Sequence, residues 1–309
     1  MSSDPFSDIL RFAKAETLVT GGFTAAGDWA IRFPVPERIK FFAVVKGHCW
    51  VRIDGEGDAV RFDTGDVGLL TARRSFVLAS APGVPPVDAM SLFSGAGREQ
   101  ATLGGGGEFA HIGGHVLLDP ISGSLLADAL PPWIHVGASS PQASTFRWLL
   151  DLLVEERSAP MPGSQLASAQ LAQLLFIQVL RAHLNTANLV APGWLRALGD
   201  PRIAPALQLM HGEPTRPWHL EELAAACAMS RTTFALHFRK VAGVAPLTYL
   251  SGWRMRLAER ALREEKRPVS SIADSLGYAS EGAFSTAFKR ATGQSPRAYR
   301  LAAHEAIPE

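Results

Sequence analysis

The feature that most constrains the fold is a block of residues that recurs fifty positions later, near the end of the 309-residue chain. The matching residues are Ser230, Phe234, Phe238, Arg239, Lys240, Gly243, Pro246 and Tyr249 in the first copy, and Ser280, Phe284, Phe288, Lys289, Arg290, Gly293, Pro296 and Tyr299 in the second. Each copy follows an alanine-rich stretch and a short turn, and carries basic residues on its second helix. The repeat predicts a duplicated helix-turn-helix, which makes double-stranded DNA the first partner to consider.

Each copy divides into a positioning helix, a turn and a recognition helix. The first spans about 219–241, and we predict its parts as Leu220–Cys227, Ala228–Ser230 and Arg231–Val241. The second spans about 269–292, with the parts Ile272–Leu276, Gly277–Ser280 and Glu281–Thr292. Its turn is one residue longer than that of the first copy. A continuous helix, Leu247–Glu265, is expected to join the copies and to hold them at a fixed separation.

The distribution of charge agrees with a nucleic-acid partner for the C-terminal part only. The whole chain has a formal net charge of +1, which by itself argues against DNA binding. From Gly199 onward, however, there are 15 basic and 11 acidic residues, whereas the part before it carries a net charge of −3. The excess of basic residues therefore lies in the duplicated region, as electrostatic attraction to phosphates requires.

Composition excludes several other classes of protein. The two cysteines cannot build a disulfide framework, and no CxxC spacing indicates a zinc site. The N-terminus resembles neither a signal nor a transit peptide, and polar residues interrupt the apolar stretch 166–184. We therefore expect a cytoplasmic protein that does not contact a membrane.

The first part of the chain is predicted to be rich in strands. Between Trp29 and about Leu118, turn residues separate five short β-rich runs, Phe41–Val45, Cys49–Ile53, Ala59–Phe62, Val67–Thr71 and Phe76–Leu78. Such spacing without intervening helices favours an antiparallel β-barrel of the jelly-roll kind. Helical periodicity then begins, over 145–156 and 164–184. The second of these helices is apolar enough to form a homodimer interface, although packing on its own barrel is the simpler interpretation.

The domain plan is an α+β protein with two domains. We predict an N-terminal sensing and dimerisation domain over 1–190, a linker over 191–199 and an all-α domain over 200–309. A helix is expected to begin at Pro201, with Asp200 as its N-cap.

The C-terminal residues resemble the AraC/XylS family of bacterial transcription regulators. The resemblance covers about 110 residues and rests on the run 256–262 together with Ile272-Ala273, Gly277-Tyr278, Phe284, 288–290, Gly293, Ser295-Pro296 and Tyr299-Arg300. The first part of the chain is similar to the cupin-type sensor domain of one branch of this family, through 47–50, Gly65-Asp66 and 130–132. The resemblance implies binding to promoter DNA, and contact with RNA polymerase if the protein is an activator.

The resemblance also implies roles for exposed residues of the two recognition helices. Base contacts would come from Arg231, Thr232, Ala235 and Leu236 in the first copy, and from Glu281, Gly282, Ser285 and Thr286 in the second. Phosphate contacts would come from Arg239, Lys240, Lys289, Arg290, Arg297 and Arg300. Leu236 and Thr286 stand where members of the family often have arginine, so we expect a site that depends less on guanine.

For the first domain, strand alternation predicts an effector pocket. Its inward positions would be Phe42, Val44, Trp50, Arg52 and the segment with His111 and His115. The expected ligand is a small-molecule effector or an oxidant, and no cofactor is expected.

Two alternatives remain open for this domain. A cupin-type metalloenzyme with a helical appendage would need His48, Cys49, His111 and His115 to converge on a metal. A thiol-based redox regulator would have to use Cys49, because Gly113-Gly114 stands where relatives that sense oxidants carry a Cys-Gly pair.

Overall fold

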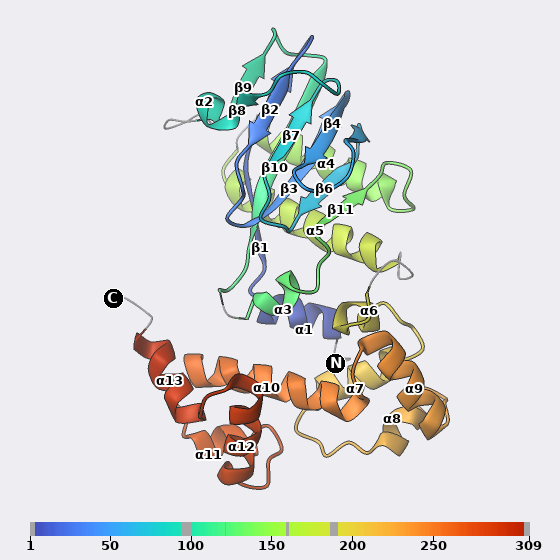
Figure 1. Ribbon diagram of the computed structural model, residues 1–309, viewed down its shortest axis with the longest axis vertical. Coiled ribbons are helices and arrows are strands. Elements are labelled where there is room, and N and C mark those ends of the chain that lie inside the picture. Colours follow the sequence, from blue (N-terminus) through green and yellow to red (C-terminus); the bar gives the residue numbers. More distant parts are fainter. Residues whose placement is uncertain (1–3, 94–99, 121, 159–160, 186–190, 306–309) are drawn as a thin grey trace. The chain divides into compact units, whose positions relative to one another are not determined.

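The computed structural model describes residues 4–93, 100–120, 122–158, 161–185 and 191–305 (Figure 1). The chain forms two compact units. We call Ala13–Thr186 the sandwich unit, and Met1–Phe12 together with Ala187–Glu309 the helical unit. The prediction of two domains, one rich in strands and one helical, is confirmed.

The sandwich unit contains two β-sheets. The first has the strand order β11-β6-β3-β10-β1-β9, with β1 (Glu16–Ala25), β3 (Ile39–Lys46), β6 (Val67–Leu70), β9 (Gln100–Leu103), β10 (Phe109–Leu117) and β11 (Trp133–Val136). The second has the order β5-β4-β7-β2-β8, with β2 (Ala30–Phe33), β4 (His48–Ile53), β5 (Val60–Asp63), β7 (Phe76–Ala79) and β8 (Val87–Asp88). All five strands that the sequence predicts are present.

The expected closed barrel is not observed. Among the described strands, no hydrogen-bonded pair joins one sheet to the other, so the sheets are open and face each other across an apolar core. Phe42 of β3 and Phe62 of β5 meet in this core with ring centroids 5.3 Å apart. The sequence missed β1, which lies before the predicted strand region and pairs antiparallel with β10 in the middle of the first sheet.

Helices cover the outer face of the six-stranded sheet. A short helix α2 (Ala89–Phe93) follows β8, and α3 (Ser124–Ala127) precedes β11. The two predicted long helices are α4 (Ala143–Ser158) and α5 (Ser164–Asn185). They pack together and against strands of the first sheet. Gln173 of α5 fixes β1 in place, because its amide accepts a hydrogen bond from Thr17 Oγ1 and donates one to the Ala15 carbonyl, both 2.9 Å long.

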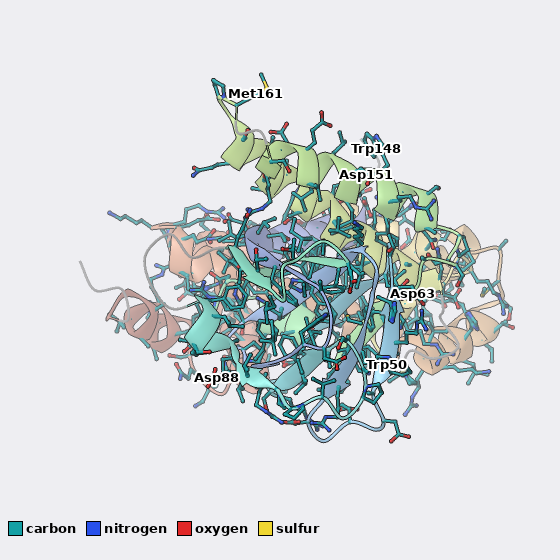
Figure 2. The ribbon with its side chains drawn as sticks, turned by 90° about the horizontal axis from the view of Figure 1, so that it is seen from above. Trp50, Asp63, Asp88, Trp148, Asp151 and Met161 are labelled. Carbon is teal, nitrogen blue, oxygen red and sulfur yellow. The ribbon has the colours of Figure 1, made fainter. Side chains whose placement is uncertain are left out.

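The surface of the α4–α5 pair that faces away from the sheets carries several large apolar side chains. Figure 2 shows Trp148 projecting from α4 and Met161 at the connection to α5, and these residues are 58% and 71% exposed. Leu166 and Leu174 of α5 are also exposed.

The helical unit consists of α1 (Pro5–Phe12), α6 (Trp194–Leu198), α7 (Ala204–Gly212), α8 (Leu220–Ala226), α9 (Arg231–Ala242), α10 (Pro246–Glu264), α11 (Val269–Asp274), α12 (Glu281–Thr292) and α13 (Pro296–Glu305). Helix α7 begins three residues after the predicted Pro201 and its N-cap is Ile203, so the prediction of Asp200 as the N-cap is wrong. The Asp200 carboxylate instead accepts a hydrogen bond from the Arg202 amide in the turn before the helix.

Two segments differ from the predicted domain plan. Residues 194–198, expected in a linker, form α6, and Ala197 joins the apolar core around α9. Helix α1, expected in the N-terminal domain, belongs to the helical unit. The Phe12 ring lies 5.6 Å from Trp253 of α10, and the guanidinium of Arg260 lies 5.7 Å from the Phe12 ring centroid. Both segments belong to the helical unit because they bury apolar side chains there, Ala197 in α6 and Phe12 in α1.

Candidate functional site

The two recognition helices, α9 and α12, begin and end in the same way. The Ser230 hydroxyl accepts a hydrogen bond from the Thr233 amide, and the Ser280 hydroxyl accepts one from the Ala283 amide, each 3.2 Å long. Each helix ends at a glycine in the left-handed conformation, with φ of +76° at Gly243 and +80° at Gly293. Ser230 is thus the N-cap of α9 and Ser280 is its equivalent in the second copy.

The buried faces of the recognition helices match as well. Phe234 and Phe238 of α9 and their counterparts Phe284 and Phe288 of α12 are all 0% exposed. A tyrosine from the following helix meets the second phenylalanine edge to face, with ring centroids 5.7 Å apart for Phe238 and 5.4 Å for Phe288. Both copies therefore hold the recognition helix with the same aromatic cluster.

The turns between positioning and recognition helices share one backbone path with different residues. The Met229 amide donates to the Ala224 carbonyl at 3.0 Å, and the Tyr278 amide donates to the Ala273 carbonyl at 3.1 Å. The left-handed position of this turn is Ala228 in the first copy, with φ +52°, and Gly277 in the second, with φ +77°. The second turn is one residue longer, as the sequence predicts.

Helix α10 connects the two copies by packing on both. Leu250 near its beginning lies in the core around α9, whereas Met255, Ala258 and Leu262 lie in the core around α12. A helix of 19 residues is about 28 Å long at the usual rise of 1.5 Å per residue. Because α10 packs into both cores, the two recognition helices are held at a fixed separation.

The predicted base-contact residues lie on matching faces of α9 and α12. Thr232, Leu236, Gly282 and Thr286 are exposed, and Leu236 keeps 67% of its surface accessible. The side chains at the remaining predicted positions are exposed or half-buried: Arg231, Ala235, Glu281 and Ser285. In each copy the four predicted residues thus share one accessible surface of the helix.

The charged groups on these faces differ in sign. In the first copy, Arg231 forms an ion pair with Glu221 of α8 at 2.8 Å, and both side chains are exposed. In the second copy, Glu281 accepts a hydrogen bond from Arg297 at 3.5 Å, so the carboxylate lies on the recognition helix and the guanidinium on α13. The first copy thus offers a cation at the start of the recognition helix, and the second an anion.

The predicted phosphate-contact residues lie near the ends of the recognition helices and on α13. Arg239, Lys240, Lys289 and Arg290 are exposed in the last turns of α9 and α12, and Arg297 is exposed on α13. Arg300 differs, because it is half-buried and its guanidinium donates to the Arg267 carbonyl at 2.7 Å. That hydrogen bond would have to be replaced before Arg300 could contact a phosphate.

In the sandwich unit, the six predicted pocket residues separate into three groups. His111 and His115 line a cavity of about 410 Å³ between the sheets. Phe42 and Val44 belong to the apolar core next to it. Trp50 and Arg52 lie on the outer face of β4, because Cys49, Val51 and Ile53 occupy its inner face. The prediction placed this one strand in the wrong register, since a shift of one residue reverses every side chain.

Lys40 was not predicted as a pocket residue, yet its side chain is the one lysine or arginine among the described residues that line this cavity. Lys40 lies on the same face of β3 as Phe42 and Val44, because alternate residues of a strand share a face, so it points into the space between the sheets. Burial lowers the pKa of Lys40 to about 8. Burial and the nearby Lys40 charge also lower the pKa of His111 to about 3 and that of His115 to about 4. A lone lysine within the apolar run 39–45 was the sequence feature that could have revealed it.

Cys49 lacks the properties of a reactive thiol. Its side chain is 0% exposed, and burial together with the neighbouring carboxylates of Asp66 and Asp63 raises the pKa of Cys49 to about 12. Oxidant sensing requires an accessible thiolate. The redox alternative therefore loses its only candidate thiol in the sandwich unit.

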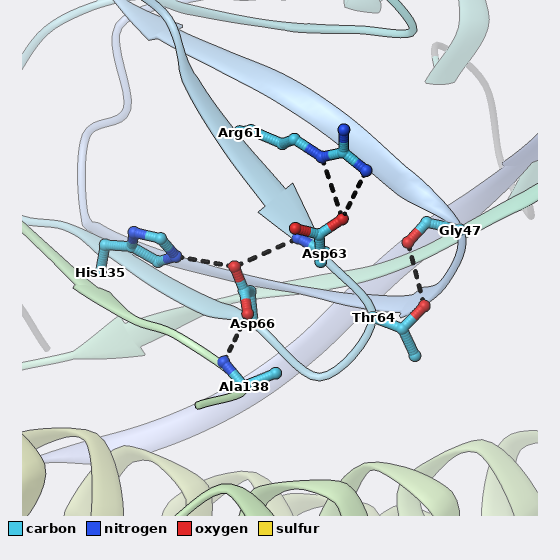
Figure 3. A network of polar contacts seen from close by, with 7 residues as sticks. All are labelled: Gly47, Arg61, Asp63, Thr64, Asp66, His135 and Ala138. Carbon is cyan, nitrogen blue, oxygen red and sulfur yellow. Dashed lines mark hydrogen bonds and ion pairs between the residues drawn. The ribbon is translucent and has the colours of Figure 1, made fainter. Parts of the chain in front are cut away.

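The same carboxylate, Asp66, organises a polar network at one end of the sandwich (Figure 3). It accepts hydrogen bonds from the Ala138 amide at 2.6 Å and the Asp63 amide at 3.1 Å, and contacts His135 Nε2 at 2.9 Å. These hydrogen bonds hold the pKa of Asp66 below its usual value despite its burial. The network connects β11 to the turn 64–66, which indicates a structural role.

The predicted metal ligands do not converge. His48 lies exposed on the outer face of β4, opposite to Cys49, so one metal ion cannot reach both. Among the residues that the structure describes, no group of three or more potential ligands is found. Within the same residues, no helix combines the length and the apolarity needed to span a membrane.

Comparison with known proteins assigns both units. Residues 4–185 match the model of a cupin family, and residues 223–302 match that of a helix-turn-helix domain. A Streptomyces lividans protein that carries the name AraC-like transcription regulator is 40% identical over 305 residues, which is 99% of this chain and 100% of the relative. A Streptomyces antibioticus protein of the same name is 39% identical over 96% of this chain and 98% of the relative.

Among solved structures, the DNA-binding domain of AdpA in complex with a target DNA is similar to the C-terminal part. It is 33% identical, covers 36% of this chain and 99% of that domain, and gives a TM-score of 0.34.

Proposed function

The chain belongs to the AraC-like family of DNA-binding transcription regulators with an N-terminal cupin domain, and from that premise we propose how its two units divide the work. The cupin domain binds a small-molecule effector. Its ligand state changes how the two helix-turn-helix copies engage promoter DNA. Such coupling requires that the effector has different affinities for the two states of the regulator. Regulation of transcription, and not catalysis, is the activity of this chain.

The observation that carries the proposal is the matched construction of the two copies. Matching serine and glycine caps, matching phenylalanine pairs and a shared α10 present two recognition helices from one chain. Successive major-groove segments on one side of DNA are about 34 Å apart, close to the length of α10. One chain can therefore place both helices in adjacent major-groove segments, a task that usually takes a dimer.

The exposed residues suggest different half-sites for the two copies. Arg231 and Thr232 would contact base edges from α9, with Leu236 against a thymine methyl group. Gly282, Ser285 and Thr286 would face bases from α12, where the carboxylate of Glu281 can accept from a cytosine amino group. Phosphate contacts from Arg239, Lys240, Lys289, Arg290 and Arg297 supply affinity without choosing sequence.

The remaining partners follow from this role. A regulator of promoters acts in the bacterial cytoplasm and contacts RNA polymerase where it activates. The exposed leucines of α5, Leu166 and Leu174, support a homodimer through the helix at 164–184.

Footprinting of the full-length protein on its promoter, over a series of salt concentrations, tests the proposal. We expect protection of two adjacent major-groove segments. Arg239→Ala should weaken binding to all sequences alike and reduce the salt dependence by about one phosphate contact. Thr232→Ala should change the preference for one base pair and leave the salt dependence unchanged. Protection of a single segment, or identical effects of both variants, would contradict the proposed roles.

A further inference from the structure

We propose that the cavity between the two sheets binds an organic carboxylate with an apolar body, and that the Lys40 ammonium is the counter-ion of the carboxylate. The proposal names a ligand class for the effector-binding role proposed above and rests on that role only for its regulatory meaning. Binding itself can be measured without DNA.

The walls of the cavity are mostly apolar and belong to a single unit of the protein. They come from β2, β7 and α2, through Phe33, Phe76, Ala89, Met90 and Phe93. The volume of about 410 Å³ lies within the usual range for a small-molecule site of about 300–1,000 Å³. The side chains that line this space lack van der Waals partners on one side, and an apolar ligand would supply those contacts.

Glycines explain why space remains in an otherwise filled interior. Gly21, Gly22 and Gly113 line the cavity without side chains. A Cβ atom on Gly22 would lie 2.2 Å from the His111 carbonyl oxygen, so β1 and β10 approach as closely as only glycine permits. A Cβ on Gly113 would lie 2.9 Å from His111 Cε1 and would displace the imidazole. The cavity and the position of His111 therefore depend on the same residues.

The ionisable side chains that line the cavity are all basic, and none of them has a partner among the described residues. No acidic residue is among its described lining residues, and no described side chain forms an ion pair or hydrogen bond with the Lys40 ammonium. The Nδ1 atoms of His111 and His115 are buried, and neither has a hydrogen-bond partner among the described residues. His111 is only 8% exposed. Buried polar atoms are almost always paired, so two buried imidazole nitrogens without described partners, next to a lysine without a described counter-ion, point to a missing anion.

The charge state of the groups favours a monoanion. Lys40 faces His115 directly across the β3–β10 pair, and Arg38 lies just before β3. The other facing elements, β1, β2, β7 and α2, contribute no titratable side chain to the described lining. With both imidazoles neutral near pH 7, Lys40 supplies one positive charge and the histidines supply hydrogen bonds. A carboxylate balances that charge, and its two oxygens can accept from Lys40 and from an imidazole N–H.

Calorimetric titration of the full-length protein with octanoate and with its neutral analogue octanamide tests the site. We expect octanoate to bind at least about tenfold more tightly than octanamide, which has the same body without the charge. Above pH 8 the affinity for octanoate should fall about tenfold per pH unit, because Lys40 loses its proton and the bound anion favours the protonated form. The affinity for octanamide should stay constant.

Two variants assign the effect to Lys40. Lys40→Met keeps the aliphatic stem, and it should abolish the preference for octanoate while the affinity for octanamide stays within about twofold. The control Lys46→Met makes the same change at the exposed end of the same strand, outside the cavity, and should bind both ligands like the wild type. Thermal unfolding without ligand should show that Lys40→Met is at least as stable as the wild type, because a desolvated charge has been removed.

Several outcomes would overturn the assignment. Equal affinity for octanoate and octanamide, an unchanged preference in Lys40→Met, or equally tight binding of acetate would each do so, since acetate has the charge without the body. If the protein protects promoter DNA and octanoate does not bind, the regulator remains and the ligand class is wrong. If octanoate binds and the promoter footprint never changes, the site stands and its proposed regulatory role fails.

Discussion

The two helix-turn-helix copies have equivalent scaffolds and different exposed faces. Serine caps, left-handed glycines and buried phenylalanine pairs recur at a spacing of fifty residues, so the two recognition helices share their caps and their central aromatic contacts. On the exposed faces, by contrast, Arg231 of the first copy is replaced by Glu281 of the second. Packing tolerates little change, whereas an exposed position can vary at almost no cost in stability. The buried residues that hold the recognition helix are therefore the same in both copies, whereas the exposed residues differ.

The largest expected effect tests whether the two scaffolds are equivalent. Phe238→Ala and Phe288→Ala should each lower the free energy of unfolding by about 3–5 kcal/mol, because both rings are fully buried. Native-state hydrogen exchange of the α9 and α12 amides in the full-length protein measures each copy separately. The control Leu236→Ala, on the exposed face, should change stability by less than about 0.5 kcal/mol. A large difference between the two phenylalanines would show that the copies are not equivalent.

The second prediction concerns the turn of the second copy. Gly277 has φ +77°, and a Cβ there would lie 2.1 Å from the Thr215 carbonyl oxygen. Gly277→Ala should therefore cost about 2–4 kcal/mol, from left-handed strain and the displaced backbone. Urea unfolding of the full-length protein measures the loss. Gly282→Ala is the matched control, because a Cβ there meets only the Ser280 hydroxyl, 3.9 Å away. An unchanged unfolding midpoint in Gly277→Ala would refute the close contact with Thr215.

The third prediction concerns the opposite charges on the recognition helices. Arg231→Ala should weaken binding to the promoter site by about 1–3 kcal/mol and affect random DNA less, because a base contact is lost. Glu281→Ala should instead strengthen binding to any DNA by about 1 kcal/mol, since it removes a carboxylate and frees Arg297 for a phosphate. Fluorescence anisotropy at fixed salt with both DNAs separates the two effects. If both variants changed the affinity for DNA in the same direction, the proposed difference between the two copies would be wrong.

The smallest effect sharpens the comparison of the turns. Ala228 adopts φ +52° where the second copy has glycine. Ala228→Gly should stabilise the first copy by only about 0.5 kcal/mol, because relief of left-handed strain is partly offset by the greater freedom of the unfolded chain. Hydrogen exchange of the α8 and α9 amides measures the gain. The same substitution at Ala235, which lies within helix α9, should be destabilising and so serves as a control. Destabilisation by Ala228→Gly would mean that alanine fits this turn without strain.

Local sequence determines the helical unit more completely than the sandwich unit, for a physical reason. In the helical unit, caps and buried faces depend on residues three or four apart, so the recurrence of Ser230 and Phe238 as Ser280 and Phe288 already predicts two matching recognition helices. In the sandwich unit, the inward face of a strand depends on its partners. Trp50 and Arg52 were predicted to line a pocket that they do not reach, because the inner and outer faces of β4 were exchanged in the prediction. The pairing of β1 with β10 could not be predicted for the same reason, since the two strands are far apart in the sequence.

The sequence by itself determined the duplicated helix-turn-helix, the division into two domains and the family of the protein, because these depend on local spacing and on a repeat. Only the tertiary structure decided that the sheets remain open, that α1 belongs to the helical unit, and that Lys40 meets His111 and His115 at one cavity. These features depend on which segments, far apart in the sequence, bury apolar surface against one another. Such pairing cannot be inferred from the local pattern of residues in either segment.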